Sequence, residues 1–274
     1  MEVEQQAFVI GASDPEADSI VRKLRREDRR VEYALGSDKQ RVHPGIAYSA
    51  AWPPPGDNQV WIECAPMGGF NSARVIRVDH HSPGDTGYGL GHTEYWRASS
   101  LGQVSEICGW VPTGNDLVVA AADHCLYEAY QGRCVGVRPS DVLSWQLSET
   151  VRRFGLTYQQ VTYQMKIFEE ILRNKAPIVL EDSSLKAYLF EEPFREFWRF
   201  LCLREVCFLH GVAYVAYVVQ GSGETEQTKI CISGNVTKDF IEGFLAGLYF
   251  AGARGQRHGC PTRRYAVLVL DKDT

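Results

Sequence analysis

The chain has 274 residues, of which 45% are hydrophobic and 23% are charged, as in an ordinary soluble globular protein. This length is long for one hydrophobic core and predicts two modest domains. A formal net charge of −5 disfavours a long nucleic acid as the partner, because such a partner normally requires a basic surface.

The first half of the chain alternates short apolar strands with helical stretches, which is typical of a parallel sheet covered on both faces. The predicted strands are Ala7–Ile10, Arg30–Leu35, Gln59–Cys64 and Ala73–Val78, and a helix is predicted from Ser19 to Arg30. The carboxyl ends of parallel strands meet at one edge of the sheet, where ligands normally bind. Residues that follow these strands are therefore expected at one site.

Acidic residues follow three of the predicted strands. They are Asp14, Glu16, Asp18, Glu63 and Asp79. Asp79 is followed by His80 and His81, so a carboxylate and an imidazole can be directed at one point, as in sites for a hard divalent metal and its bound water. The alternative is that these acids are ordinary first-turn residues of helices, which the helix dipole favours.

Three further features follow along the chain. Residues 82–91 are rich in glycine and predict either a flexible lid or a loop that binds phosphate through its N–H groups, and the absence of a following lysine favours the lid. A serine pair, Ser99 and Ser100, comes next. Asp123 ends the apolar run 118–122, which is predicted to be a helix.

The second half of the chain predicts helices first and a mixed domain afterwards. From Ser140 to about Phe200 the pattern is helical, with apolar residues at helical spacing over 157–172. Strands over 211–219, 229–233 and 265–270, with a helix over 237–249, predict a small α+β domain. The expected organisation is an α/β metal-binding domain (1–138), a helical connector (139–205) and a substrate-binding domain (206–274).

The eight cysteines have no regular spacing and several lie in apolar runs, which favours free thiols in a reducing compartment over disulfides or a zinc site. No apolar run approaches the ~18 residues that a membrane span requires. The acidic start of the chain lacks the basic region of a signal peptide. We expect a cytoplasmic protein with no membrane partner.

The order of these motifs resembles the DHH phosphoesterase superfamily, whose members include RecJ-like exonucleases and nanoRNases. The resemblance implies a set of ligands for Mn²⁺ or Mg²⁺: Asp14, Glu16, Asp18, Glu63, Asp79, His80 and Asp123. It also implies catalytic roles for His80, His81 and Asp79, with Asp79 orienting His80. Ala12 stands where one branch of the family has a histidine, and glutamates replace two aspartates, so a second metal would be held less well.

The family also grips its substrate with a glycine-rich loop before the last strand. The matching stretch here carries donors suited to phosphate oxygens, namely Arg257, His258, Arg263 and Arg264. The resemblance implies that these residues and the pair Ser99 and Ser100 bind substrate. A solvated basic loop is the alternative for the C-terminal stretch.

The leading hypothesis is a metal-dependent hydrolase that acts on a phosphoester of a small or short phosphorylated substrate: a nucleotide, a dinucleotide or a short oligonucleotide. A second is a degenerate member of the fold that binds a phosphorylated ligand or partner without hydrolysing it. A third is a different metal-dependent reaction on the same scaffold. The sequence does not determine the leaving group or the oligomeric state, and a homodimer is compatible with it.

Overall fold

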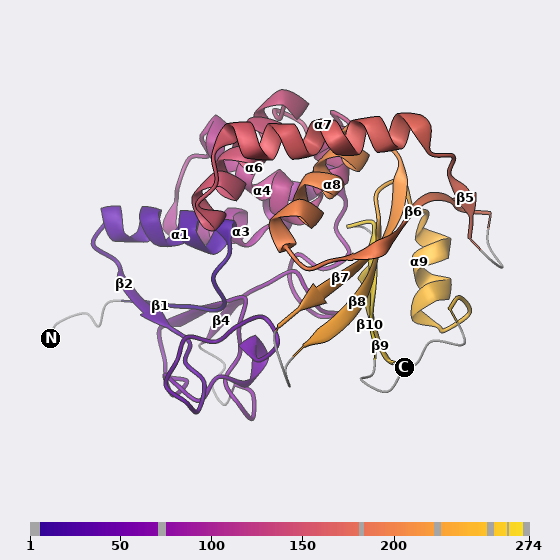
Figure 1. Ribbon diagram of the computed structural model, residues 1–274. Coiled ribbons are helices and arrows are strands. Elements are labelled where there is room, and N and C mark those ends of the chain that lie inside the picture. Colours follow the sequence, from indigo (N-terminus) through magenta and orange to yellow (C-terminus); the bar gives the residue numbers. More distant parts are fainter. Residues whose placement is uncertain are drawn as a thin grey trace, which may run out of the picture. The chain divides into compact units, whose positions relative to one another are not determined.

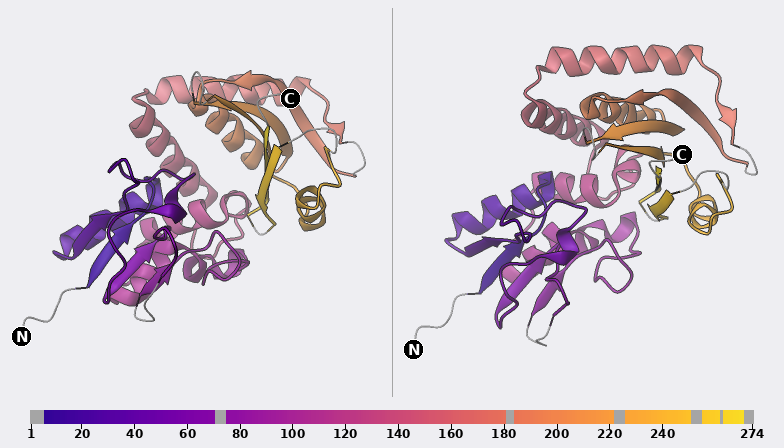
Figure 2. Two further views of the ribbon diagram at one scale, coloured as in Figure 1. Left: turned by 90° about the horizontal axis from the view of Figure 1, so that it is seen from below. Right: turned by 60° about the horizontal axis from the view of Figure 1, so that its bottom comes forward.

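The computed structural model describes residues 6–70, 75–180, 184–221, 226–250, 255–261 and 263–270. The chain divides into two compact units, Met1–His124 and Cys125–Thr274 (Figures 1 and 2). The first unit contains a parallel sheet with helices, and the second contains helices and a mixed sheet. The predicted fold class is therefore confirmed.

The sheet of the first unit has four parallel strands in the order β2-β1-β3-β4. Their bounds are β1 Ala7–Ile10, β2 Arg30–Tyr33, β3 Gln59–Ile62 and β4 Ile76–Val78. All four strand predictions are confirmed, although β2 and β3 end earlier than predicted and residues 73 and 74 lie outside the described residues. The strand order changes direction between β1 and β3, so the topological switch point, where ligands bind in open α/β sheets, lies at their carboxyl ends.

Helix α1 (Pro15–Arg26) begins directly after β1. Asp14 is its N-cap and accepts a hydrogen bond from the backbone N–H of Ala17 at 2.7 Å, and Pro15 at the first position fixes the backbone for the helix. Predicted to start at Ser19, the helix starts four residues earlier. The acidic residues after β1 therefore lie on a helix and not on an extended loop.

The two faces of this sheet are covered differently. Helix α1 and helix α3 (Ser100–Cys108) lie along one face (Figure 1). On the other face, Val9 and Trp61 pack against chain from the segment between β2 and β4, which holds the short 3-10 helix η1 (Ala47–Ser49). The prediction of a sheet covered on both faces is confirmed, but irregular chain takes the place of helices on the second face.

The remaining helices of the first unit follow β4. They are η2 (His92–Glu94), α2 (Tyr95–Ala98) and α4 (Gly114–His124). Asp123, expected to follow a helix, instead lies in the last turn of α4.

The second unit contains a six-stranded sheet in the order β5-β6-β7-β8-β10-β9, in which β6 and β7 are parallel and the other neighbours antiparallel. Its strands are β5 Ile178–Val179, β6 Lys186–Phe194, β7 Ala213–Gln220, β8 Gln227–Ser233, β9 Gly255–Cys260 and β10 Tyr265–Leu270. Its helices are α5 Leu126–Tyr130, α6 Pro139–Phe154, α7 Tyr158–Asn174, α8 Phe197–Leu209 and α9 Lys238–Leu245.

Alternate residues of β7 face different helices. Val215 packs in a core cluster with Ile241 and Phe244 of α9. Tyr214, on the opposite face of the sheet, contacts Phe200 of α8 with ring centroids 6.1 Å apart. Helices α8 and α9 thus cover opposite faces of the second sheet (Figure 1).

The expected helical connector, residues 139–205, is helical only in part. It contains α6, α7 and the start of α8, but also the strands β5 and β6. Strand β6 pairs in parallel with β7, which follows α8 along the chain, and this tertiary pairing overrides the local helical pattern. The structure places the connector within the second unit, which begins at Cys125 and not at residue 139.

Within the described ranges, none of the helices combines the length and the apolar character needed to cross a bilayer. All eight cysteines are free, and six of them are buried. The prediction of free thiols is confirmed.

Candidate metal centre

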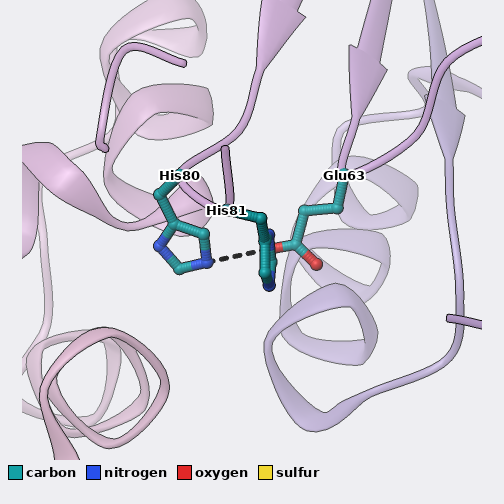
Figure 3. A group of neighbouring side chains, drawn as sticks. All are labelled: Glu63, His80 and His81. Atoms are coloured by element: carbon teal, nitrogen blue, oxygen red, sulfur yellow. Dashed lines mark ion pairs between the residues drawn. The ribbon is translucent and has the colours of Figure 1, made fainter. Parts of the chain in front are cut away.

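Four side chains from the first unit meet at the carboxyl edge of its sheet. We call Glu16, Glu63, His80 and Asp123 the ligand cluster, since one potential ligand atom from each lies within 4.8 Å of the others. His80 Nε2 lies 3.1 Å from Asp123 Oδ2 and 3.4 Å from Glu63 Oε1. Figure 3 shows His80 and Glu63 directed toward one another from the ends of neighbouring strands.

The backbone at the end of β3 is in an unusual conformation. Glu63 has φ of +52°, in the left-handed region that residues with a Cβ seldom adopt. A Cβ at Gly11 would lie only 2.4 Å from the carbonyl oxygen of Glu63, so the chain after β1 must be glycine for the two strand ends to approach this closely. This strain at the strand end is typical of a functional site.

The start of helix α3 holds two carboxylates of the cluster. Ser100 donates its hydroxyl to Glu63 Oε1 at 2.8 Å, and the backbone N–H of Leu101 donates to Glu16 Oε1 at 3.0 Å. Ser99 is the N-cap of α3 and accepts from the N–H of Gly102. Both serines are fully buried, so they support the ligand cluster, in contrast to the predicted substrate contacts.

The ligand cluster holds three carboxylates against one imidazole, so negative charge is in excess. Burial, with the nearby Asp123 and Glu63 carboxylates, raises the pKa of Glu16 well above its usual range. Burial likewise raises the pKa of Asp14, together with Glu63 and Asp123. Burial opposes ionisation of Glu63 too, but its hydrogen bond with His80 and the nearby His81 bring its pKa below the usual value.

A divalent cation fits this arrangement. Glu16 Oε2 is buried and has no hydrogen-bond partner among the residues that the structure describes. A buried carboxylate oxygen left in this way costs free energy, which a bound cation would remove. Three carboxylates and one imidazole form a donor set suited to Mn²⁺ and, with its oxygen donors, to Mg²⁺.

Asp79 does not belong to the ligand cluster. It is fully buried, and its Oδ1 accepts from the N–H of His80 at 2.7 Å and from Nδ1 of His81 at 2.9 Å. Burial opposes ionisation, but hydrogen bonds from His81 and the backbone hold the Asp79 pKa below its usual range. The prediction that Asp79 orients the imidazole of His80 is wrong, because its carboxylate holds the imidazole of His81.

His81 lies beside the cluster and is more exposed than its neighbours. Its side chain is 36% exposed, and an atom of its ring can join Glu63 and His80 in a second group of ligands (Figure 3). Because Nδ1 is hydrogen-bonded to the ionised Asp79, the other ring nitrogen, Nε2, is the one available to a ligand.

Asp14 and Asp18, both predicted ligands, lie outside the ligand cluster. Asp14 uses its carboxylate as the N-cap of α1 and has a side-chain hydrogen bond with Glu63. Residues two apart on a helix point to different sides, so Glu16 and Asp18 cannot both face the cluster. The prediction began the helix only at Ser19, after these acidic residues, whereas α1 begins at Pro15.

His124 is a residue that the sequence analysis missed. It is buried, its Nδ1 lies 3.1 Å from Nδ1 of His80, and its Nε2 lies 2.8 Å from the carbonyl oxygen of Leu90. The signal in the sequence was its position directly after Asp123, in the same turn of helix.

The glycine-rich segment after His81 is fixed at several points. The Asp85 carboxylate accepts from the N–H of Ser82 and forms an ion pair with Arg77 at 2.7 Å. The N–H of Gly87 donates to the carbonyl of Asp79 at 3.0 Å, and a Cβ at Gly87 would lie 2.6 Å from Cβ of His80. These contacts tie the segment to the site, in contrast to the expected flexible lid.

The C-terminal basic residues are partly strand and partly turn. Arg257 and His258 lie in the edge strand β9 and not in the predicted turn. Arg257 packs over the ring of Phe244 at 5.0 Å, whereas the side chain of His258 is exposed.

Arg263 and Arg264 lie in the turn between β9 and β10. Arg263 packs over the ring of Tyr265 at 5.8 Å, and Arg264 is committed to an ion pair with the buried Glu128. A role of the four residues in substrate binding stays a prediction, and Arg264 is the least available of them.

Comparisons with known proteins add little to what the geometry of the site indicates about function. No family model matches the chain, and no curated protein matches it. Among solved structures, the chain is similar to a pGpG-specific phosphodiesterase, PggH, from Vibrio cholerae, with 9% sequence identity and a TM-score of 0.37 over 97% of this chain and 94% of that one.

Proposed function

We propose that this protein is a metal-dependent hydrolase that cleaves a phosphoester of a small or short phosphorylated substrate. The observation that carries the proposal is the ligand cluster, in which three carboxylates and an imidazole from four separate elements meet at the switch point of a parallel sheet. The order of these residues along the chain resembles the DHH phosphoesterases, which supports the same reaction class.

In this proposal the ligand cluster holds one Mn²⁺ or Mg²⁺ ion. When bound, the ion supplies a nucleophile from water near neutral pH and offsets the negative charge of the phosphate. The buried ligand atoms have their positions fixed by α3, through Ser100 on Glu63 and the N–H of Leu101 on Glu16. The geometry is therefore preorganised before substrate binds.

His81 is the residue we assign to proton transfer or to phosphate binding. Asp79 orients it through Nδ1, as an ionised carboxylate beside an imidazole does in many acid–base sites. Its exposed edge is the part of the site open to a substrate. The acidic net charge of the chain favours a substrate with few phosphates over a long nucleic acid.

The test is hydrolysis of bis(4-nitrophenyl) phosphate, followed by a panel of 5′-phosphorylated dinucleotides and short oligonucleotides, with and without Mn²⁺. Activity that requires Mn²⁺ and is lost in His80→Ala is expected. No hydrolysis of any phosphodiester or phosphomonoester by the metal-loaded, folded protein would contradict the proposal.

A second candidate, binding without hydrolysis, is favoured by one observation. Ala12 stands at the position of a possible nitrogen ligand and Asp18 lies outside the ligand cluster, so two of the ligands expected for a second ion are not in place. This candidate predicts Mn²⁺-dependent binding of a phosphorylated dinucleotide with no turnover, which the same panel distinguishes by calorimetry.

A further inference from the structure

His80 and His124 contact each other through their Nδ1 atoms. Their Nδ1 atoms are 3.1 Å apart, whereas the ring centroids are 5.2 Å apart, so the two nitrogens lie between the rings. The ring planes differ by 29°, and the two Nδ1 atoms form a hydrogen bond. Both side chains are buried, at 1% and 2% exposure, so water does not compete for this hydrogen bond.

The carbonyl of Leu90 decides which nitrogen of His124 carries a proton. A carbonyl oxygen only accepts hydrogen bonds, so His124 Nε2, 2.8 Å away, is the protonated nitrogen. The Nδ1 atom of a neutral His124 is then a bare acceptor. The opposite arrangement would require a second proton and a buried positive charge on His124, which is costly.

From these contacts we infer that His124 is a positioning residue, which fixes His80 in the tautomer with a proton on Nδ1. With a metal ion bound, His80 would then present a lone pair on Nε2, the atom that lies 3.1 Å from Asp123 and 3.4 Å from Glu63. The chain of contacts runs from the Leu90 carbonyl through His124 to His80 and ends at the ligand cluster. The inference rests on the proposed metal site and adds to it the residue that prepares its nitrogen ligand.

This arrangement also gives the segment before η2 a role in the site. Leu90 is near the end of the glycine-rich segment, which is tied at Asp85 and Gly87. Its carbonyl is therefore held in place, and with it the orientation of His124. Hydrogen-bond partners behind a metal-binding histidine typically change metal affinity by about 10–100-fold when removed.

The test compares two substitutions of the same shape, His124→Asn and His124→Leu, in the full chain. Both remove the ring and the hydrogen bond to Leu90, but only asparagine keeps an acceptor for Nδ1–H of His80. The Mn²⁺ dissociation constant, measured from the electron paramagnetic resonance of free Mn²⁺, is expected to rise by about 10–100-fold in His124→Leu. In His124→Asn it is expected to rise much less.

Equal dissociation constants in the two variants would overturn the inference, because His124 would then act only through packing. A second measurement does not need the metal or a variant that folds. In the long-range ¹H–¹⁵N spectrum of the unaltered, metal-free protein at pH 9, the Nδ1 of His80 is expected to be protonated and the Nδ1 of His124 bare. The reverse pattern would overturn the inference, whereas a failure of the unaltered protein to bind Mn²⁺ would overturn the proposed function.

Discussion

Glu16 is the residue in which the demands of metal binding and of stability conflict most directly. It is almost fully buried, and its Oε2 has no hydrogen-bond partner within the described part of the chain. Burial, together with two other carboxylates, raises its pKa. Without a cation, ionisation of this side chain in the folded protein costs free energy.

We therefore predict that Glu16→Gln stabilises the metal-free protein at neutral pH and abolishes stabilisation by Mn²⁺. Glutamine keeps the shape and the oxygen that accepts from Leu101 but removes the charge. The measurement is the melting temperature with EDTA and with Mn²⁺, and each kcal/mol corresponds to about 2–4 °C for a chain of this order of size. Asp18→Asn, on the same helix but outside the ligand cluster, is the control and should leave the response to Mn²⁺ unchanged.

Asp79 allows acid–base function to be separated from metal binding. Asparagine retains an acceptor for the N–H groups of His80 and His81 but carries no charge to hold the imidazole of His81. We predict that Asp79→Asn lowers kcat by about 100-fold or more, as loss of general acid–base catalysis does, with Mn²⁺ affinity nearly unchanged. A loss of Mn²⁺ in proportion to the loss of activity would make Asp79 part of the metal site instead.

At the scale of elements, the segment 82–91 offers a matched pair of glycines. A Cβ at Gly87 would meet the carbonyl of Ala98 at 1.9 Å and Cβ of His80 at 2.6 Å, whereas a Cβ at Gly91 meets nothing within 4 Å. Neither residue has a positive φ, so the comparison isolates packing.

We expect Gly87→Ala to destabilise the protein by about 1–3 kcal/mol, as overpacking does, and to weaken Mn²⁺ binding because His80 is displaced. Gly91→Ala should change neither. Urea unfolding and Mn²⁺ titration of both variants provide the measurement. If the segment were a mobile lid, the two substitutions would have similarly small effects on both quantities.

The sequence predicted all four strands of the first unit, although two of them end earlier than predicted. Buried runs such as Ala7–Ile10, followed by polar residues, carry their own signal, and parallel pairing places their carboxyl ends together. The expectation that Asp14, Glu63 and Asp79 lie at one edge of the sheet followed from that rule. Their exact partners did not, because side-chain contacts depend on helices whose positions the pattern does not give.

Three differences between the predicted and the observed structure have the same physical origin. Helix α1 starts at Pro15, which turns Asp18 away from the ligand cluster, and α3 buries Ser100 against Glu63. Strand β6 forms by pairing with β7, which follows α8 along the chain. Each depends on a tertiary contact that overrides a local pattern.

At the scale of the whole molecule, the charge of the metal site predicts how stability responds to pH. The pKa values of Asp14 and Glu16 are raised in the folded state, so the folded protein binds more protons than the unfolded chain above the ordinary carboxyl range. Their contribution to stability is therefore lost as pH rises. Metal binding at the proposed site must displace the proton of Glu16 and is favoured at higher pH.

The stabilisation by a fixed Mn²⁺ concentration should accordingly be larger at pH 8 than at pH 5.5. When the free Mn²⁺ concentration is 100 times the dissociation constant, the stabilisation by Mn²⁺ amounts to about 2.7 kcal/mol. Denaturant unfolding at both pH values, with Mn²⁺ and with EDTA, measures the difference. Glu16→Gln, which removes the carboxyl group whose proton the metal displaces, should reduce the dependence of this stabilisation on pH.

The central claim is that the ligand cluster holds a divalent metal ion, and an equilibrium Mn²⁺ titration of the purified, metal-free chain tests it most directly. We predict one tightly bound ion per chain in the unaltered protein. Binding should be weakened strongly in Asp123→Asn and in His80→Ala, with both variants folded by circular dichroism. Absence of Mn²⁺ binding in the unaltered protein, or an unchanged dissociation constant in both variants, would contradict the account.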